Sequence, residues 1–398
     1  MIQLKDICDI YDCPHTTAKD EGKGYPLVRT PNVGKGRLLL NGIHRVSEDV
    51  YNSRNSRAIP EEGDLILARE APVGNVSIIM QGQRVCLGQR VVLIKPKREL
   101  VDPHYLTYYL LSAEVQNRLK NQANGAVVAH LNVSDIRNLL VSLPELDEQI
   151  AIGKILRSIE DKIELNNRIN HNLEEQAQAL YKSYFVDFEP FKDGKFVDSE
   201  LGLIPEGWRV AELGTVTRQS SQKVKDRIDV KVLSPVTTGE LVLSEEYFTK
   251  QVFSESISKY IVVKPLHFAY NPARVNIGSI GMNMFSFDGC VSPVYVVFEC
   301  EKGYHHFFDY YRKTASFKDE VLNRAIGGVR QTLSYKDFAL IKLVYPPYDI
   351  VEKFNCIYAR LLENKNSIKR EISKLSELRD TLLPKLLSGE LKINDLTC

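Results

Sequence analysis

The segment NGAVVAHLNVSDIRNLLVSLP (124–144) decides the fold, because a variant of it returns as IGGVRQTLSYKDFALIKLVYP (326–346). The two copies lie 202 residues apart and share matched glycine, leucine, aspartate and proline positions. Upstream, CLGQRVVLI (86–94) returns as CVSPVYVVF (290–298), 204 residues later. Similarity at a long, nearly fixed period predicts a duplicated architecture. We therefore expect two similar domains in this chain of 398 residues, which is too long for one ordinary core.

Each half is predicted to be a strand-rich block followed by one long helix. Short apolar runs bounded by Gly, Pro and Asn, such as VVLIK (91–95) and LIKLVY (340–345), predict strands. Apolar residues three or four apart predict helices within 102–120 and 305–322. The expected fold class is therefore α+β. We expect these parts: a first domain at 1–145, a first long helix at 146–186, a central linker at 187–212, a second domain at 213–347, a second long helix at 348–390 and a tail at 391–398.

The two long helices share one apolar pattern in the same phase. Apolar residues recur with alternating spacings of four and three, which is the pattern of a coiled-coil seam. The alternative is that the two amphipathic helices pack on separate domains. The matched phase favours pairing of the helices with one another, in an antiparallel arrangement. The expected seam residues are Ile152, Leu156, Ile159, Ile163, Asn166, Asn170, Leu173, Leu180, Leu361, Ile368, Ile372, Leu375 and Leu382.

Charge and composition exclude several classes of protein. The net charge is +1, but it divides into +2 for 1–145, −6 for 146–212, +4 for 213–345 and +1 for 346–398. Mildly basic blocks suit polyanion binding without proving it. Seven cysteines without a C-x-x-C pair argue against a disulfide framework and favour a reducing compartment. Neither a signal peptide nor a membrane span is expected, so we predict a cytoplasmic protein without membrane contact.

Catalytic signatures are missing from the sequence. It contains no G-x-x-x-x-G-K-[ST] phosphate loop. The stretch YNPARVN (270–276) has the Asn-Pro start of an amino-methyltransferase signature, but it lacks the second proline and the aromatic residue. We therefore predict no catalytic residue and no metal ligand, and we interpret the chain as a binding scaffold.

The centre of the chain carries its most specific motif, YKSYFVDFEPFKDGKFVDSELGLIPEGWRVAELG (181–214). This segment resembles the central region of type I restriction–modification specificity (S) subunits. Three other segments resemble the same family: LKDICDI (4–10), HLNVSDIRNLLVSLPELDEQIAI (130–152) and LRDTLLPKLLSGEL (378–391). The resemblance covers essentially the whole chain.

That resemblance implies two target-recognition domains joined by a pair of long antiparallel coiled-coil helices. It implies a subunit without catalysis or cofactor of its own, which binds double-stranded DNA and reads one half of a split target with each domain. Two modification subunits using S-adenosylmethionine would methylate one adenine in each half, and restriction/translocase subunits using ATP and magnesium would complete the complex. Because the two domains differ away from the shared strands, we expect an asymmetric target.

Sequence readout needs Arg, Lys, Asn or Gln at base edges, whereas phosphate contacts fix position. Such residues cluster in predicted loops of both blocks, and we expect these clusters rather than each single member to contact DNA. The candidate DNA-binding residues are Arg29, Asn32, Lys35, Arg37, Arg54, Arg57, Arg69, Arg90, Lys223, Lys225, Arg227, Arg274 and Arg330.

Two other functions remain open from the sequence. One is a stand-alone DNA-binding protein with S-subunit architecture and no restriction partners, which copurification of a large methyltransferase subunit would exclude. The other is a modification enzyme with an unrecognised catalytic site, which binding of S-adenosylmethionine by the chain alone would support.

Overall fold

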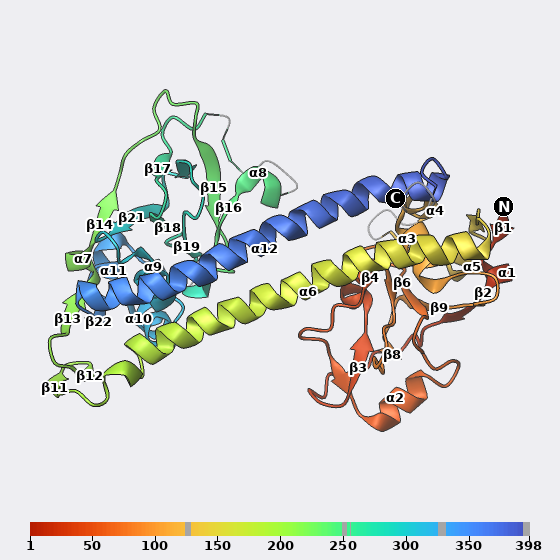
Figure 1. Ribbon diagram of the computed structural model, residues 1–398, viewed down its shortest axis with the longest axis horizontal. Coiled ribbons are helices and arrows are strands. Elements are labelled where there is room, and N and C mark those ends of the chain that lie inside the picture. The colour runs from red at the N-terminus through yellow and green to blue at the C-terminus, as the bar shows by residue number, and fades with distance from the viewer. Residues whose placement is uncertain (124–128, 249–252, 255, 325–331, 393–398) are drawn as a thin grey trace. The chain divides into compact units, whose positions relative to one another are not determined.

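The computed structural model describes these residues: 1–123, 129–248, 253–254, 256–324 and 332–392. They form two compact units. The first comprises Met1–Ile169 and Ile368–Cys398, and the second comprises Asn170–Ser367. Each unit contains one sheet domain and part of each of two long helices, α6 (Leu146–Phe185) and α12 (Tyr348–Ser388) (Figure 1).

The first unit is built on a five-stranded sheet. In spatial order its strands are β2 (Cys8–Asp12), β9 (Val91–Pro96), β6 (Leu65–Ala68), β7 (Val76–Ile78) and β4 (Gly36–Arg37). A smaller sheet has the order β5 (Arg45–Val46), β3 (Tyr25–Val28) and β8 (Cys86–Leu87), and β1 (Ile2–Gln3) pairs with β10 (Leu140–Val141). Every residue of β6 is buried, which explains its unbroken apolar run.

Short helices accompany these sheets, and two of them begin at side-chain caps. They are α1 (Leu4–Ile7), η1 (Thr30–Asn32), α2 (Glu48–Arg54), α3 (Pro103–Leu111), α4 (Ala113–Gln122) and α5 (Val133–Arg137). Asp102 caps α3 by accepting a hydrogen bond from the Tyr105 amide at 2.8 Å, and Pro103 occupies the first helical position. Ser112 ends α3 and caps α4 in the same way.

The second unit contains two four-stranded sheets. One has the order β14 (Thr217–Ser220), β21 (Val296–Cys300), β18 (Phe268–Tyr270) and β19 (Ile280–Met282). The other has the order β16 (Leu241–Leu243), β15 (Lys231–Pro235), β20 (Gly289–Val291) and β17 (Ile261–Val263). The second sheet domain also contains β13 (Arg209–Glu212) paired with β22 (Lys342–Tyr345), α7 (Leu213–Val216), α8 (Ser244–Tyr247), η3 (Val275–Ile277), α9 (His305–Tyr311), α10 (Ala315–Arg324) and α11 (Tyr335–Phe338).

The two units repeat one topology. The order β2-β9-β6-β7 in the first returns as β14-β21-β18-β19 in the second. The parallel pair β3–β8 returns as β15–β20, and the antiparallel pair β1–β10 returns as β13–β22. The predicted α+β fold of two similar domains with long antiparallel helices is therefore confirmed.

The expected seam residues lie on the inward side of the long helices. Ile152, Leu156, Ile159, Ile163 and Asn166 are buried. The others are half-buried: Asn170, Leu173, Leu180, Leu361, Ile368, Ile372, Leu375 and Leu382.

The helices run antiparallel within each unit. In the first unit, Glu160 of α6 accepts a hydrogen bond from Arg379 of α12 at 2.6 Å, and Leu156 shares a core with Leu386. Within the second unit, Glu174 pairs with Lys365, and the rings of Phe185 and Phe354 lie 5.1 Å apart. As residue numbers rise along α6, the numbers of the α12 residues that they contact fall, in both units. The helices therefore contact one another as well as the sheet domains.

Each sheet domain is fixed to the long helices by a short polar join. In the first unit α6 approaches α3 closely, because a Cβ at Gly153 would lie 2.4 Å from the Asp102 carboxylate. The buried Gln149 amide donates to the Pro144 carbonyl at 2.9 Å and accepts from the Asp102 amide at 3.1 Å. These contacts fix the orientation of α3 relative to α6.

The second unit makes the same join with different side chains. Asn355 stands 202 residues after Gly153 and donates to the Gly303 carbonyl at 2.8 Å. The Tyr304 hydroxyl donates to the Pro346 carbonyl at 3.0 Å. Pro346 stands 202 residues after Pro144, whose carbonyl accepts from Gln149 in the first unit. The geometry of the join is therefore repeated although its chemistry is not.

A partly buried carboxylate adds an electrostatic tie in the second unit. Glu174 of α6 contacts Lys313, which follows α9, at 3.2 Å and also pairs with Lys365 of α12. Burial raises the pKa of this carboxyl, but the charges of Lys313 and Lys365 outweigh burial and hold the pKa at about 2. Glu174 therefore links the sheet domain and both long helices.

The central segment is an ordered joint in the second unit. It forms η2 (Glu189–Phe191) and a hairpin of β11 (Phe196–Ser199) with β12 (Gly202–Pro205). The ring of Trp208 lies 5.3 Å from those of Phe188 and Phe191 and 6.0 Å from that of Phe185, at the end of α6. This aromatic cluster fixes the path from the long helix into the second sheet domain.

We expect Glu174→Gln to lower the free energy of unfolding of the second unit by about 2 kcal/mol, because it leaves two lysines with a weakened partner. The pKa of Glu174 is lowered on folding, so its contribution is fully present above pH 4.5 and is lost as the pH falls toward 2. Denaturant unfolding followed by fluorescence of Trp208 measures the effect. Glu175→Gln, at the exposed neighbour, is the control; equal losses in the two variants would contradict the assignment.

Candidate nucleic-acid interface

The first cluster of candidate DNA-binding residues surrounds η1 and β4. Lys35 is exposed, and Arg29 is half-buried. The Asn32 side chain is buried, and its Oδ1 accepts a hydrogen bond from the Arg29 amide at 3.1 Å. Arg37 pairs with Asp161 of α6. The structure therefore leaves Lys35 directed to solvent, whereas Asn32 holds the loop and Arg37 ties β4 to the long helix.

Two of the arginine candidates lie inside the first domain. Arg54 is 7% exposed, and its guanidinium donates to the Leu87 carbonyl at 2.6 Å and the Thr16 carbonyl at 2.8 Å. Arg69 is also buried and donates to the Leu131 carbonyl at 2.8 Å. Their donors are used within the protein, so we propose a structural role for both. A single sequence could not reveal this, because a buried arginine has the same local pattern as an exposed one.

Arg57 and Arg90 are exposed in the same domain. The Arg57 guanidinium contacts the Asp12 carbonyl at 3.4 Å. Arg90 directly precedes β9, has a left-handed backbone with φ of 63°, and pairs with Glu70 at 2.7 Å. Both remain candidates for DNA contact.

In the second unit the basic loop before β15 presents two free lysines. Lys223 and Lys225 are exposed, and neither has a side-chain partner among the described residues. Arg227 instead pairs with Asp229 at 2.5 Å and Asp288 at 2.8 Å, so it braces the loop.

The loop is anchored by two buried valines. Val224 is buried, and its amide donates to the Tyr260 carbonyl at 2.9 Å; Val230, at the other end, is also buried. The lysines are thus held on a defined backbone. The two other candidates of this unit are Arg274, which is exposed next to η3, and Arg330, which lies outside the described residues.

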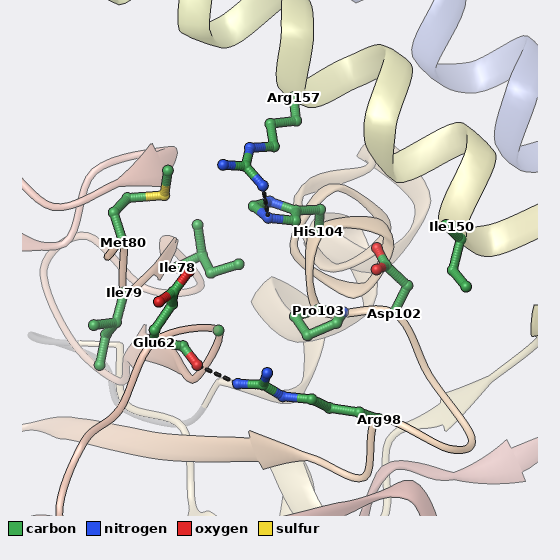
Figure 2. Close-up of a pocket in the computed structure, with 11 residues that line it drawn as sticks. Glu62, Ile78, Ile79, Met80, Arg98, Asp102, Pro103, His104, Ile150 and Arg157 are labelled. Carbon is green, nitrogen blue, oxygen red and sulfur yellow. Dashed lines mark hydrogen bonds between the residues drawn. The ribbon is translucent and has the colours of Figure 1, made fainter. Parts of the chain in front are cut away.

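A pocket of about 290 Å³ lies in the first unit, between the sheet domain and α6 (Figure 2). Arg157 of α6 donates to the ring of His104 at 3.2 Å, and Arg98 donates to the Glu62 carbonyl. Burial, and next the charge of Arg157, lower the pKa of His104. The lining residues share no sequence motif, because they come from four separate segments.

This pocket contains no set of nucleophile, base and orienting group. Its histidine accepts a hydrogen bond from one arginine, its Asp102 caps α3, and its other arginine holds a loop carbonyl. Within the described part of the chain, no group of three or more His, Cys, Asp and Glu is placed to hold a metal ion. No helix among those residues is long and apolar enough to cross a membrane.

The chain is similar in sequence to known proteins. A family model described as the type I restriction modification DNA specificity domain matches residues 1–175. Over 410 residues the chain is 27% identical to the type I restriction enzyme MjaIX specificity subunit of Methanocaldococcus jannaschii, covering 99% of this chain and 94% of that protein. It is 23% identical to the type I restriction enzyme HindI specificity subunit of Haemophilus influenzae, covering 83% of this chain and 87% of that protein.

A solved structure shares the fold. The crystal structure of the type I restriction–modification system S subunit from M. genitalium matches with a TM-score of 0.58 and 16% sequence identity, covering 97% of this chain and 95% of that chain. The repeated sheet domains and paired long helices therefore share their fold with an S subunit, and the sequence is similar along its length to type I restriction enzyme specificity subunits. The predicted resemblance to specificity (S) subunits is thereby confirmed.

We expect the double variant Lys223→Ala, Lys225→Ala to weaken DNA binding and to flatten its salt dependence. Each phosphate contact contributes about −0.9 to the slope of log affinity against log salt, so the slope should fall by about 2. Fluorescence anisotropy of a labelled duplex at several salt concentrations measures it. Lys192→Ala with Lys195→Ala, in the central segment, removes the same charge as a control. Identical slopes in both double variants would exclude this loop from the interface.

Proposed function

We propose that this chain is the DNA-recognition subunit of a type I restriction–modification complex. Each sheet domain reads one half of a split, asymmetric target, and the chain itself catalyses nothing. The observation that carries this proposal is the repetition of one sheet topology in two units, each fixed to antiparallel helices, in a chain similar along its length to specificity subunits.

In such a subunit, the joins between domain and helix keep each DNA-reading face in a fixed orientation. A domain that reads bases must hold its reading face in a fixed direction, because a small change in orientation misplaces every hydrogen bond. Gln149 in the first unit and Tyr304 in the second both bond the backbone where a domain meets its helix. The long helices then serve as the surface for two modification subunits.

The chemistry belongs to the partner subunits in this proposal. Two modification subunits bind S-adenosylmethionine and methylate one adenine in each half of the target. Restriction/translocase subunits use ATP and magnesium to cut DNA that lacks the mark. The whole complex acts in the cytoplasm, where it meets both host and foreign DNA.

Methylation-aware sequencing of the host genome tests the function directly. We expect a split motif with a methylated adenine in each half, which disappears when the gene for this chain is deleted and returns when it is restored. If no motif depends on the chain, the proposal fails. Absence of a copurifying methyltransferase subunit would indicate a stand-alone DNA-binding protein, and binding of S-adenosylmethionine by the chain alone would indicate an enzyme.

Removing one heptad from each long helix tests whether the helices set the gap between the half-sites. Residues 159–165 and 374–380 are the matched choice, because Glu160 and Arg379 bond one another. A heptad spans about 10 Å, or about 3 base pairs of DNA. We expect the methylated motif to shorten by about this amount, whereas deletion of 159–165 alone should disrupt pairing. An unchanged gap in the double deletion would show that the helices are not the ruler.

A further inference from the structure

The two sheet domains present different side chains at one repeated place. In the first, β6 pairs with β9 up to Ala68 and Val91. Glu70 follows that end of β6 after one residue, and Arg90 directly precedes β9. We call the ends of these two strands, with Glu70, Arg90 and the neighbouring His130, the first strand-end patch.

The second domain has the matching place at the ends of β18 and β21. These strands pair up to Tyr270 and Val296. Arg274 follows β18 by four residues, and Val294 precedes β21 by two. Continuing the register sets position 272 opposite position 294, so the two exposed side chains belong to neighbouring segments. Arg274 and Val294 form the second strand-end patch.

In the first patch a chain of bonds holds the arginine in one direction. Arg90 is 62% exposed in its side chain, and its Nη1 lies 2.7 Å from Glu70 Oε2. Glu70 Oε1 lies 2.8 Å from His130 Nδ1, and His130 Nε2 lies 2.8 Å from Nη2 of the buried Arg69. A guanidinium only donates, so Nε2 of His130 accepts and its Nδ1–H donates to Glu70. The exposed Arg90 is thus oriented from the interior of the domain.

In the second patch the arginine comes from the other strand and has an apolar companion. Arg274 is exposed, and its side chain has no partner among the described residues. Val294 is 71% exposed, although β21, which begins two residues later, is largely buried. Val294 lies 204 residues after Arg90, at the same position of the repeat. One place in the fold therefore carries an arginine–glutamate pair in one domain and an arginine–valine pair in the other.

We propose that the strand-end patches read bases, and that their different side chains make the two half-sites different. This inference rests on the proposed function. An arginine at a base edge pairs with O6 and N7 of guanine, and an apolar side chain contacts the methyl group of thymine. Arg90 therefore reads a guanine in the half-site of the first domain. In the half-site of the second domain, Arg274 reads a guanine and Val294 a neighbouring thymine. Glu70 acts as a positioning residue, because it touches Arg90 rather than the base.

The test uses the complete complex with its modification subunits, and duplexes that carry the motif methylated by the wild type. Each base pair of each half is replaced in turn, and the initial methylation rate is measured. Arg90→Ala is expected to reduce discrimination about tenfold at one G·C pair, and only in the half read by the first domain. Val294→Ala is expected to reduce it about three- to fivefold at one A·T pair of the other half, as the loss of about one buried methyl contact with the thymine implies.

Control variants separate reading from folding. Lys5→Ala on α1 and Leu340→Ala in the second unit remove an exposed cation and an exposed apolar side chain, and both should leave every preference unchanged. Glu70→Ala should reduce discrimination at the same base pair as Arg90→Ala while affinity for unrelated DNA stays or rises, because a negative charge is removed. A purely structural role for Glu70 would lower the melting temperature without this pattern.

The outcomes are distinct. If the methylation rates of Arg90→Ala and Val294→Ala rank the duplexes in the same order as those of the wild type, the patches do not read bases. The proposed function still stands in that case, provided that the wild type methylates a split motif. If either variant alters preferences equally in both halves, the assignment of one patch to one half is wrong. If the wild-type complex shows no sequence preference, the inference and the proposed function both fail.

Discussion

The contact between each sheet domain and the long helices is the constraint on which the rest of the structure depends. The core of the first unit includes Leu156 of α6 and Leu386 of α12 together with residues of the sheet domain. That of the second unit includes Tyr181 and Phe354 from the same two helices. Neither domain completes its core alone, so its orientation on the helices is part of its folding rather than a later docking step.

The architecture could be predicted from the sequence because it depends on periodicity. The repeat at about 202 residues and the heptad pattern specify two similar domains and paired helices without any three-dimensional information. The central segment was also recognisable, because its aromatic residues and prolines have no simpler explanation. Its conformation, a hairpin preceded by phenylalanines that pack on Trp208, could not be derived from the pattern alone.

The candidate site was much less predictable, because exposure depends on tertiary packing. Arg54 and Arg90 are both arginines in polar stretches, yet one donates to carbonyls in the interior and the other is exposed. Glu70 and Val294 carry no positive charge, so nothing in the sequence marks them as DNA-binding residues. The signal that points to Val294 is its alignment with Arg90 in the repeat, which was present in the sequence but has meaning only when both positions are known to be exposed.

The path of the chain through the two units bears on the order of synthesis. All residues of the second unit lie between Asn170 and Ser367, whereas the first unit needs Ile368 and the residues that follow it. Leu386 is buried in the core of the first unit, and Leu382, Leu383, Leu387 and Leu391 pack against that core. On the ribosome the domain made first must therefore wait for the last residues, while the domain made second can close before it. A premature stop codon in α12 would thus damage the domain encoded at the opposite end of the gene.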